Sequence, residues 1–500
     1  MGYYFISIGG SGAKVMESLT HLCAAGLLPN KEKQQKLYVM AIDPDIGNGN
    51  LKRSSAALNC FAQFQDVPVG MDTPLFKTEV ELAKPFIWNP AEHDKKLDDI
   101  LSYQIYKGSP IGNLYEVLYT QEERNTFLNE GFRGRPSIGA AVLAKKVQLG
   151  DGTDGLHVDT APWDKFSRLV HQDAKNGQTA KIFLAGSVFG GTGAAGMPTI
   201  AHLLRRTFGN YYDEGKVMIG GALILPYFAF TPSLSDQESY GIFASSENFL
   251  TNTKAALKYY ALKDKDYHSL YFIGDDILSQ VPNFSIGAST QNNDAHVVDL
   301  YGAMAAIDFY GSTPENRKEY SYLAHAKENT FHWTDFPDIL MDDQTQVSFK
   351  NRFIQFTRFI FSYVHLVKPV LGDLASGKIP SYKYPWFLDY LADLNISDAA
   401  VRNFHEYTET FTRWLQQIET SENHRAVELI RKSSFDANPA SIVPDQFSSC
   451  AYDENSEVTI HELWYRFSER TCADMENTKG FGRFLRLLYD CCAKEKEEAR

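Results

Sequence analysis

The chain has 500 residues, a hydrophobic fraction of 44% and a formal net charge of −13. Its length predicts roughly two to four domains with substantial cores. The negative charge argues against non-specific nucleic-acid binding, which needs a basic surface. No run of about 18 apolar residues occurs, so we expect no membrane span.

The cysteines and the N-terminus indicate the compartment. The six cysteines form no C-x-x-C pair, so we interpret them as free thiols in a reducing compartment without a metal site. Residues 1–8 lack a basic region followed by an apolar signal stretch. We therefore expect a cytoplasmic protein.

The first predicted element is a short apolar strand over residues 3–8, which ends in Gly9, Gly10, Ser11 and Gly12. Apolar residues then recur at helical spacing over 15–22. Glycines let the backbone approach an anion closely. The free N–H groups and dipole of a helix start attract that anion. The order of strand, glycine loop and helix therefore predicts a phosphate-binding loop.

A second buried strand over 37–42 ends at Asp43 and Asp45. The Asp45 carboxylate can hold Mg²⁺ through water, or it can cap a helix, and the sequence leaves both alternatives open. Residues 46–130 are mixed and mostly helical in pattern, with several prolines. We interpret them as partly inserted, more than as a layer of the core.

The third loop spans 131–139, is also rich in glycine, and leads into a predicted helix over 140–147. It contains Arg133, Gly134 and Arg135. The two arginines can add positive charge beside a γ-phosphate, or they can be solvated loop residues.

The fourth loop is the richest in glycine. It follows a buried strand over 181–185, precedes a helical pattern, and contains Gly186, Gly190, Gly191, Thr192 and Gly193. No lysine follows the glycines as in G-x-x-x-x-G-K-[ST], and the spacing is not G-x-G-x-x-G. The Thr192 hydroxyl can add a donor. We predict a second phosphate cradle here, against the alternative of a flexible surface loop.

Further strands are predicted over 217–225 and 270–273, and helices over 243–260 and 295–310. Strands that alternate with helices over roughly 310 residues predict an α/β fold with a doubly wound parallel sheet. Ligands of such sheets bind at the carboxyl ends of the strands. We therefore expect the three glycine loops and the Asp43/Asp45 turn to converge there.

Beyond residue 340 the pattern becomes helical. Amphipathic helices are predicted over 353–367, 386–394, 399–419, 425–432, 463–471 and 481–492, with the first ending at Pro369 and a linker over 374–384. We therefore divide the chain into a nucleotide-binding domain over 1–310 and a mainly helical region over 311–500.

The order of these motifs resembles the tubulin/FtsZ superfamily of GTPases, as a divergent bacterial tubulin-like protein. The fourth loop is similar to F-x-x-A-G-M-G-G-G-T-G-T-G-A-A-P-V-I-A. Residues 9–12, 41–45 and 131–139 resemble the family's other phosphate loops, and 216–227 resembles the turn beside the ribose. Residues 295–307 are similar to the central helix, and 333–338 resemble the synergy loop N-V-D-F-A-D.

The resemblance implies GTP/GDP and Mg²⁺ as ligands and self-association head to tail into filaments. It implies that Asp335 and Asp338 position the attacking water in the site of a neighbouring subunit. Near the central helix, Asn292, Asn293 and His296 can read a guanine edge and Tyr301 can stack on it. Helix capping or core packing is the alternative for each.

Some positions depart from the family pattern. Phe189 and Ala195 replace glycines of the fourth loop, Ala13 stands where the family has Asn, and Trp333 replaces the Asn of the synergy loop. These departures favour a second hypothesis: a nucleotide-bound scaffold with slow or no hydrolysis that recruits a protein partner through its C-terminal helices, in an anti-phage or plasmid system. A dinucleotide oxidoreductase is disfavoured, because it needs G-x-G-x-x-G and has no use for further glycine loops.

Overall fold

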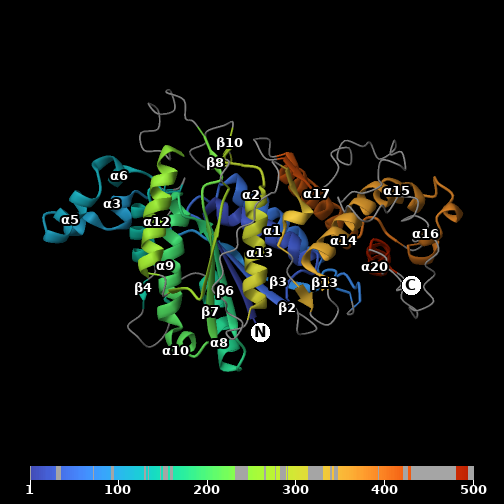
Figure 1. Cartoon of the computed structure of the whole chain (residues 1–500), viewed down its shortest axis with the longest axis horizontal. Coiled ribbons are helices and arrows are strands. Elements are labelled where there is room, and N and C mark those ends of the chain that lie inside the picture. The colour runs from blue at the N-terminus through green and yellow to red at the C-terminus, as the bar shows by residue number, and fades with distance from the viewer. Residues whose placement is uncertain are drawn as a thin grey trace. The chain divides into compact units, whose positions relative to one another are not determined.

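The computed structural model describes residues 2–29, 35–70, 73–91, 95–128, 131–132, 134–146, 148–149, 156–157, 161–230, 246–263, 266–275, 278–281, 289, 291–312, 330–337, 340–342, 347–391, 394–420, 426–429 and 480–493 (Figure 1). The chain divides into two compact units. Unit 1 comprises residues 1–19, 36–56 and 80–317, and unit 2 comprises 20–35, 57–79 and 318–500. Among the helices described, none is both long and apolar enough to cross a membrane.

Unit 1 is built on a six-stranded sheet of order β3-β2-β1-β6-β7-β9. Its strands are β1 (Gly2–Ile8), β2 (Gln35–Ile42), β3 (Thr78–Trp88), β6 (Ala180–Ser187), β7 (Val217–Ile224) and β9 (Ser269–Ile273). Neighbours from β2 to β9 pair in parallel. Strands β6 and β7 are buried throughout, as expected of parallel strands covered on both faces. The α/β class and the parallel sheet are confirmed, and the doubly wound arrangement stays a prediction.

Helices cover both faces of this sheet. Successive side chains of a strand point to opposite faces, and β1 shows where each leads. Tyr4 packs on Phe166 of α8 (Ala161–Lys175), with ring centroids 5.5 Å apart. Tyr3 packs on Tyr310 of α13 (Val297–Gly311) at 4.7 Å. Helices α8 and α13 therefore lie on opposite faces (Figure 1).

Two glycines bring helices directly onto the strands. A Cβ on Gly12 of α1 (Gly9–Ala24) would lie 2.3 Å from the Ala185 carbonyl oxygen of β6. A Cβ on Gly196 of α9 (Gly191–Thr207) would lie 2.5 Å from Cγ2 of Ile8. Since α1 follows β1 and α9 follows β6, this close packing brings the two helix starts to the same edge of the sheet.

Residues 46–130 differ in part from the expected insertion. After α2 (Gly49–Phe64), residues 78–88 form the outer strand β3 of the main sheet. Pro85 makes this strand hard to predict from the sequence, because proline is tolerated in sheets chiefly at edges.

Short helices follow β3: α3 (Leu97–Ile100), α4 (Tyr103–Tyr106), α5 (Pro110–Leu118) and α6 (Gln121–Asn125), before α7 (Pro136–Lys146). A separate small core lies between α3 and α7, with Tyr115 of α5 packed against it. It is made of Leu97, Ile100, Leu128, Phe132, Ile138 and Val142 together with Ala91.

The rest of unit 1 consists of short elements and one longer helix. These are β4 (Gln148–Leu149), β5 (Leu156–His157), α10 (Gly209–Asp213), β8 (Phe228–Ala229), α12 (Phe249–Lys263) and β10 (Ser279–Gln280). Strand β8 follows β7 and pairs in parallel with β10.

Unit 2 is mainly helical, as the sequence predicts. It contains α14 (Phe349–Ser362), a π-helical turn over 363–367, α15 (Lys368–Ala375), α16 (Pro385–Tyr390), α17 (Ala399–Thr420) and α20 (Phe481–Cys491). Strands β12 (Leu340–Asp342) and β13 (Val347–Ser348) pair before α14. The helix predicted over 463–471 lies outside the described residues.

Two predictions for unit 2 are wrong. The chain stays helical through Pro369, because this proline stands in the first turn of α15, where a helix needs no N–H partner. Within 425–432, predicted as a helix, residues 426–428 form β14 (Ala426–Glu428). It pairs in parallel with β11 (Thr330–His332), a partner too distant in sequence to be read from the local pattern.

Candidate functional site

One pocket of unit 1 is lined by all four loops that the sequence analysis singled out. The predicted residues that line it are Gly9, Gly10, Ser11, Asp43, Asp45, Gly134, Gly190, Gly191, Thr192, Gly193 and Asn293. They come from the ends of β1, β2 and β6, the start of α7, and the segment before α13. The convergence expected at the carboxyl ends of the strands is therefore present, whereas nucleotide binding by these residues stays a prediction.

Two helix starts meet in this pocket. Helix α1 begins at Gly9, whose φ of +72° favours glycine, and a Cβ there would lie 3.2 Å from Cβ of Thr192. Helix α9 begins at Gly191, and its N-cap residue Gly190 offers no side-chain cap. The first N–H groups of a helix have no partner within the helix. The pocket therefore combines the donor groups of two adjacent helix starts.

The main chain of the third loop lies directly beside the main chain of the fourth loop. A Cβ on Gly191 would lie 3.0 Å from the backbone nitrogen of Gly134. Arg135 does not line the pocket, and its half-exposed guanidinium lies 3.8 Å from a carboxylate oxygen of Glu123. This favours the alternative of a solvated loop arginine for Arg135. Arg133 lies outside the described residues.

The acidic turn after β2 is held by its own backbone. The Asp45 N–H donates to Oδ1 of Asp43 at 3.0 Å, and the Gly47 N–H donates to Oδ1 of Asp45 at the same distance. Asn48 caps α2, accepting from two N–H groups of that helix. Burial raises the pKa of Asp43 to about 8.

The acids of the pocket are too few to enclose a metal. Among the described residues no group of three or more His, Cys, Asp or Glu side chains is arranged to hold a metal ion. Mg²⁺ is commonly bound through one or two carboxylates together with water and substrate phosphates. Asp43 and Asp45 fit that donor set.

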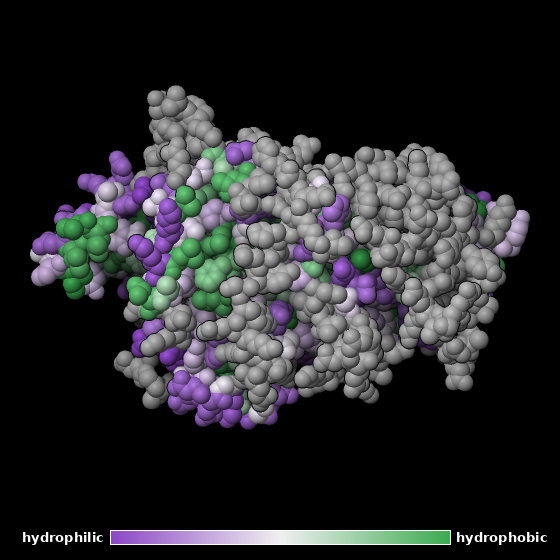
Figure 2. Space-filling model, in the orientation of Figure 1, coloured by the Kyte–Doolittle hydropathy of each residue, from purple (hydrophilic) through white to green (hydrophobic). Residues whose placement is uncertain are grey.

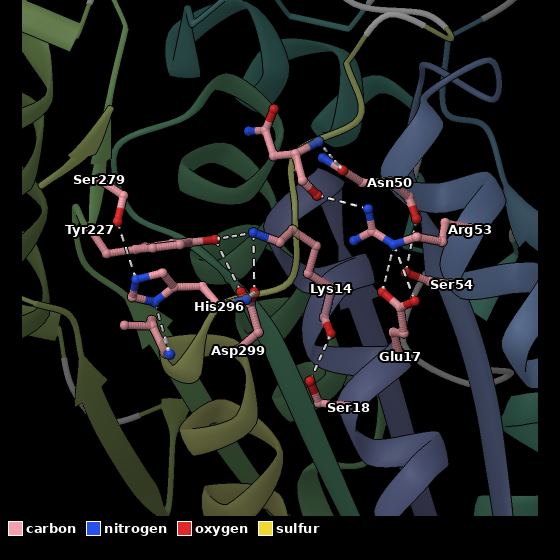
Figure 3. A network of polar contacts seen from close by, with 12 residues as sticks. Lys14, Glu17, Ser18, Asn50, Arg53, Ser54, Tyr227, Ser279, His296 and Asp299 are labelled. Carbon is pink, nitrogen blue, oxygen red and sulfur yellow. Dashed lines mark hydrogen bonds and ion pairs between the residues drawn. The ribbon is translucent and has the colours of Figure 1, made fainter. Parts of the chain in front are cut away.

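A buried polar network forms one wall of the pocket (Figure 3). Nζ of Lys14 donates to the Tyr227 hydroxyl at 2.9 Å and lies 3.1 Å from Oδ2 of Asp299. The Tyr227 hydroxyl donates to the other carboxylate oxygen at 3.0 Å. Burial lowers the pKa of Lys14 and raises that of Tyr227.

Lys14 is not among the residues predicted from the sequence, although its position offers a signal. Lys14 follows the first glycine loop and stands among the apolar residues Ala13, Val15 and Met16. A charged side chain is rarely fully buried unless it is paired.

Four carboxamide side chains line another part of the pocket. They are Asn48, Asn50, Gln291 and Asn293, of which the sequence analysis named only the last. Nδ2 of Asn48 donates to Oε1 of Gln291 at 2.6 Å, and the Asn293 N–H donates to Oδ1 of Asn50 at 2.8 Å. Carboxamides both donate and accept hydrogen bonds. They suit an uncharged polar group of a ligand, such as a base or a sugar.

Of the other candidates for base recognition, His296 and Asn292 make contacts within the chain. His296 caps α13, its Nδ1 accepting from the Val298 N–H at 3.1 Å. The Asn292 carboxamide oxygen accepts from Arg53 at 2.9 Å. Tyr301 lies on α13 and does not line the pocket. For His296 the capping alternative therefore holds.

Two predicted glycines lie just behind the pocket. Gly12 and Gly186 do not line it. Gly12 allows α1 to pack on β6, and a Cβ on Gly186 would lie 3.0 Å from the Ile8 carbonyl oxygen. Main-chain packing excludes a side chain at Gly12, and at Gly186 a Cβ would be in tight contact with the main chain.

The unusual Phe189 belongs to an aromatic wall of the pocket. Its ring centroid lies 4.5 Å from that of Phe249 and 5.6 Å from that of Phe228. Phe189, Phe228, Phe230 and Phe249 all line the pocket. The side chain that replaces glycine in the fourth loop therefore adds apolar surface to the site.

The predicted catalytic acids belong to unit 2. Oδ2 of Asp335 accepts from the His332 N–H at 2.8 Å and so completes a capping box around the 3-10 turn over 333–335. Trp333 is buried, and its Nε1 donates to the Leu429 carbonyl oxygen at 2.9 Å. Asp338 lies outside the described residues. The catalytic roles of both acids stay a prediction.

Comparison with known proteins assigns no family. No family model and no curated protein match the chain. Among solved structures, the chain is similar to CetZ from Methanosaeta thermophila strain DSM 6194, with 14% identity over 62% of this chain and 51% of that chain, and a TM-score of 0.23. The chain thus spans about half of that protein. This similarity is too distant to assign a function.

Proposed function

We propose that this chain is a tubulin-like GTPase that binds GTP through its glycine loops and assembles head to tail into filaments. One observation carries the proposal. Four loops that occur in the order of the tubulin/FtsZ superfamily, and are far apart in the sequence, line a single pocket. A dinucleotide enzyme needs only one such loop.

The phosphates are held mainly by main chain. Gly9, Gly10, Gly191 and Gly193 leave the N–H groups of two helix starts uncovered by side chains. The one buried lysine of the pocket is already paired with a carboxylate, so it adds little net charge. The Thr192 hydroxyl supplies a further donor.

Asp43 and Asp45 hold Mg²⁺ together with phosphate oxygens. The bound ion supplies positive charge that offsets the charge of the phosphates during phosphoryl transfer. An adjacent cation favours the ionised carboxylate. The raised pKa of Asp43 therefore falls when Mg²⁺ and nucleotide are present.

The base and ribose lie against the carboxamides and aromatic rings of the pocket. The carboxamides of Asn48, Asn50, Gln291 and Asn293 supply both donors and acceptors. The choice of guanine over adenine follows from the family resemblance.

Hydrolysis is completed by a second subunit. By resemblance, Asp335 and Asp338 of one subunit position the water in the nucleotide pocket of the next. Positioning and charge stabilisation supply most of the catalysis in phosphoryl transfer to water. A contact between an acid-bearing face and a nucleotide-bearing face is heterologous, and such contacts propagate into filaments.

A second candidate is a nucleotide-bound scaffold that hydrolyses slowly or not at all. The capping bond of Asp335 to the His332 N–H favours it, because that carboxylate already has a structural role. In this candidate the helices of unit 2 recruit a partner protein.

A matched pair of variants tests the nucleotide site. Thr192 lines the pocket, whereas Thr199 lies on the same helix α9, outside the pocket, with its hydroxyl bonded to the Ala195 carbonyl oxygen at 2.7 Å. We expect Thr192→Val to weaken binding of GTP with Mg²⁺, measured by calorimetry, about 10- to 150-fold, because one hydrogen bond to a charged group contributes about 1.5–3 kcal/mol. Thr199→Val leaves it unchanged. Equal effects, or wild-type protein that binds no GTP at millimolar concentration, contradict the proposal.

Assembly is tested separately by sedimentation with GTP and with GDP. The GTPase hypothesis expects GTP-dependent pelleting and a turnover rate per subunit that rises with protein concentration. Bound nucleotide without pelleting and without turnover supports the scaffold.

A further inference from the structure

The short helices between β3 and α7 carry an exposed apolar surface. Four residues of α5 are 58% to 83% exposed, and two residues of α4 are 78% and 40% exposed. We call these six residues the α4–α5 patch: Ile105, Tyr106, Ile111, Leu114, Val117 and Leu118. Figure 2 shows apolar residues (green) gathered at the left of the view, where Figure 1 labels α5. Contiguous apolar surface of this kind marks interaction sites.

The patch is a regular helix face. Ile111, Leu114 and Leu118 follow the i, i+3, i+7 spacing of one side of a helix, and Val117 lies beside them. The other side of α5 faces inward through Tyr115, whose hydroxyl donates to Asp98 at 2.8 Å. Tyr115 also packs on the small core formed by α3 and α7, so α5 has apolar residues on its inward side and on its solvent side, whereas an ordinary surface helix is polar toward solvent.

The patch is held rigidly. Ser109 caps α5 by accepting from the Gly112 N–H at 3.1 Å. Arg124 donates to Asp98 at 3.1 Å, and its guanidinium lies 4.1 Å from the centroid of the Tyr103 ring. A fixed surface loses little entropy when it binds. The exposed side chains are therefore presented on a preorganised scaffold.

We infer that the α4–α5 patch is the contact between two copies of this chain, related by a two-fold axis. Six large side chains amount to roughly half to all of the 800 Å² per partner that a standard interface buries. Each copy brings the same apolar ridge, so the contact is self-complementary and closed.

Charge favours a second copy over a membrane. The chain carries a net charge of −13, so two copies repel except through faces with few acids. Of the residues of α4 and α5, Glu116 alone is charged. Residues 95–128 contain five acids against four bases (Lys95, Lys96, Lys107, Arg124), so they lack the basic excess that draws a helix to anionic lipid.

Sedimentation velocity of the full chain without nucleotide tests this inference. The wild type should form a two-chain species at micromolar concentration. Leu114→Glu and Val117→Glu should raise the dimer dissociation constant at least about tenfold, because each places two buried charges in the contact. Leu262→Glu is the matched control, since Leu262 is 81% exposed on α12, outside the patch, and it should dimerise as the wild type does.

Three outcomes overturn the inference. One is a wild type that stays a single chain at 100 µM. Another is a Leu114→Glu variant that dimerises as the wild type does while its circular dichroism spectrum is native. A third is a monomeric wild type that sediments with vesicles of phosphatidylcholine and phosphatidylglycerol. No nucleotide is present, so none of these results bears on the proposed GTP site.

Discussion

Lys14 and Asp299 form a buried ion pair that joins the second turn of α1 to the first turn of α13, with 3.1 Å between Nζ and Oδ2. Both side chains are almost fully buried. Removing one partner leaves an uncompensated charge inside the protein. We expect Lys14→Met to lower the free energy of unfolding by about 3–5 kcal/mol.

The double variant Lys14→Met/Asp299→Asn separates the interaction energy between the two charges from a general loss of packing. It removes both charges and keeps an acceptor for the His296 N–H, which donates to Asp299 at 2.8 Å. Its loss of stability in urea should be clearly smaller than the sum of the single losses. Additive losses would show that the pair is not coupled.

Close packing within the fourth loop predicts a steric effect at Gly193. A Cβ there would lie 2.4 Å from the Ser187 carbonyl oxygen, so the loop must shift. We expect Gly193→Ala to weaken GTP binding more than about tenfold and to lower stability by about 1–3 kcal/mol. Gly209→Ala is the control, because nothing lies within 4 Å of its Cβ position, and this helical site should become slightly more stable. Unchanged affinity in Gly193→Ala would contradict the close contact between this loop and the ligand.

Burial of Asp43 predicts a pH dependence of stability. The pKa of Asp43 is about 8 in the folded chain, above the ordinary carboxyl value of about 3.9. Between these two pH values the Asp43 carboxyl is protonated in the folded chain and ionised in the unfolded chain. The contribution of this group to stability is therefore present at low pH and is lost as the pH rises toward 8, by at most about 1.4 kcal/mol per pH unit.

The measurement is urea unfolding at pH 5, 6.5 and 8 for wild type and Asp43→Asn, without Mg²⁺ or nucleotide. The wild type should lose stability relative to the variant as the pH rises. A difference that does not change with pH would mean that Asp43 is ionised throughout.

Asp335 allows its capping role to be separated from the proposed catalytic role. Asn keeps an oxygen that accepts from the His332 N–H but removes the charge. If the carboxylate positions water, Asp335→Asn should lower GTP turnover at least about 100-fold while unfolding in urea changes by less than about 1 kcal/mol. Turnover equal to that of the wild type would assign Asp335 to the cap alone.

Much of the fold can be predicted from local pattern. Strands β1, β6 and β7 are continuous apolar runs because both faces of a parallel sheet are covered. The glycine-rich ends of β1 and β6 mark the pocket, because glycines let the main chain of two helix starts come close together there. These signals are local, which is why sequence alone brings residues 9–12 and 190–193 to one site.

The remainder depends on contacts between distant segments. Lys14 donates to the Tyr227 hydroxyl across 213 positions of sequence, so the residues next to either one do not predict this contact. The local sequence around Asn48 and Asn50 is typical of a turn. Their place in the pocket depends on hydrogen bonds to Gln291 and Asn293, which are distant in sequence. Strand β14 has only three residues and exists through its pairing with β11. Non-local pairing of this kind overrides local propensity.

Amide hydrogen exchange of the full chain, with and without GTP and Mg²⁺, tests the central claim most directly. If main-chain N–H groups of two helix starts hold the phosphates, exchange should slow at residues 9–12 and at residues 190–193 together when GTP is saturating, with a smaller change in α10. Unchanged exchange in both loops at millimolar GTP would contradict a nucleotide site built from these glycines.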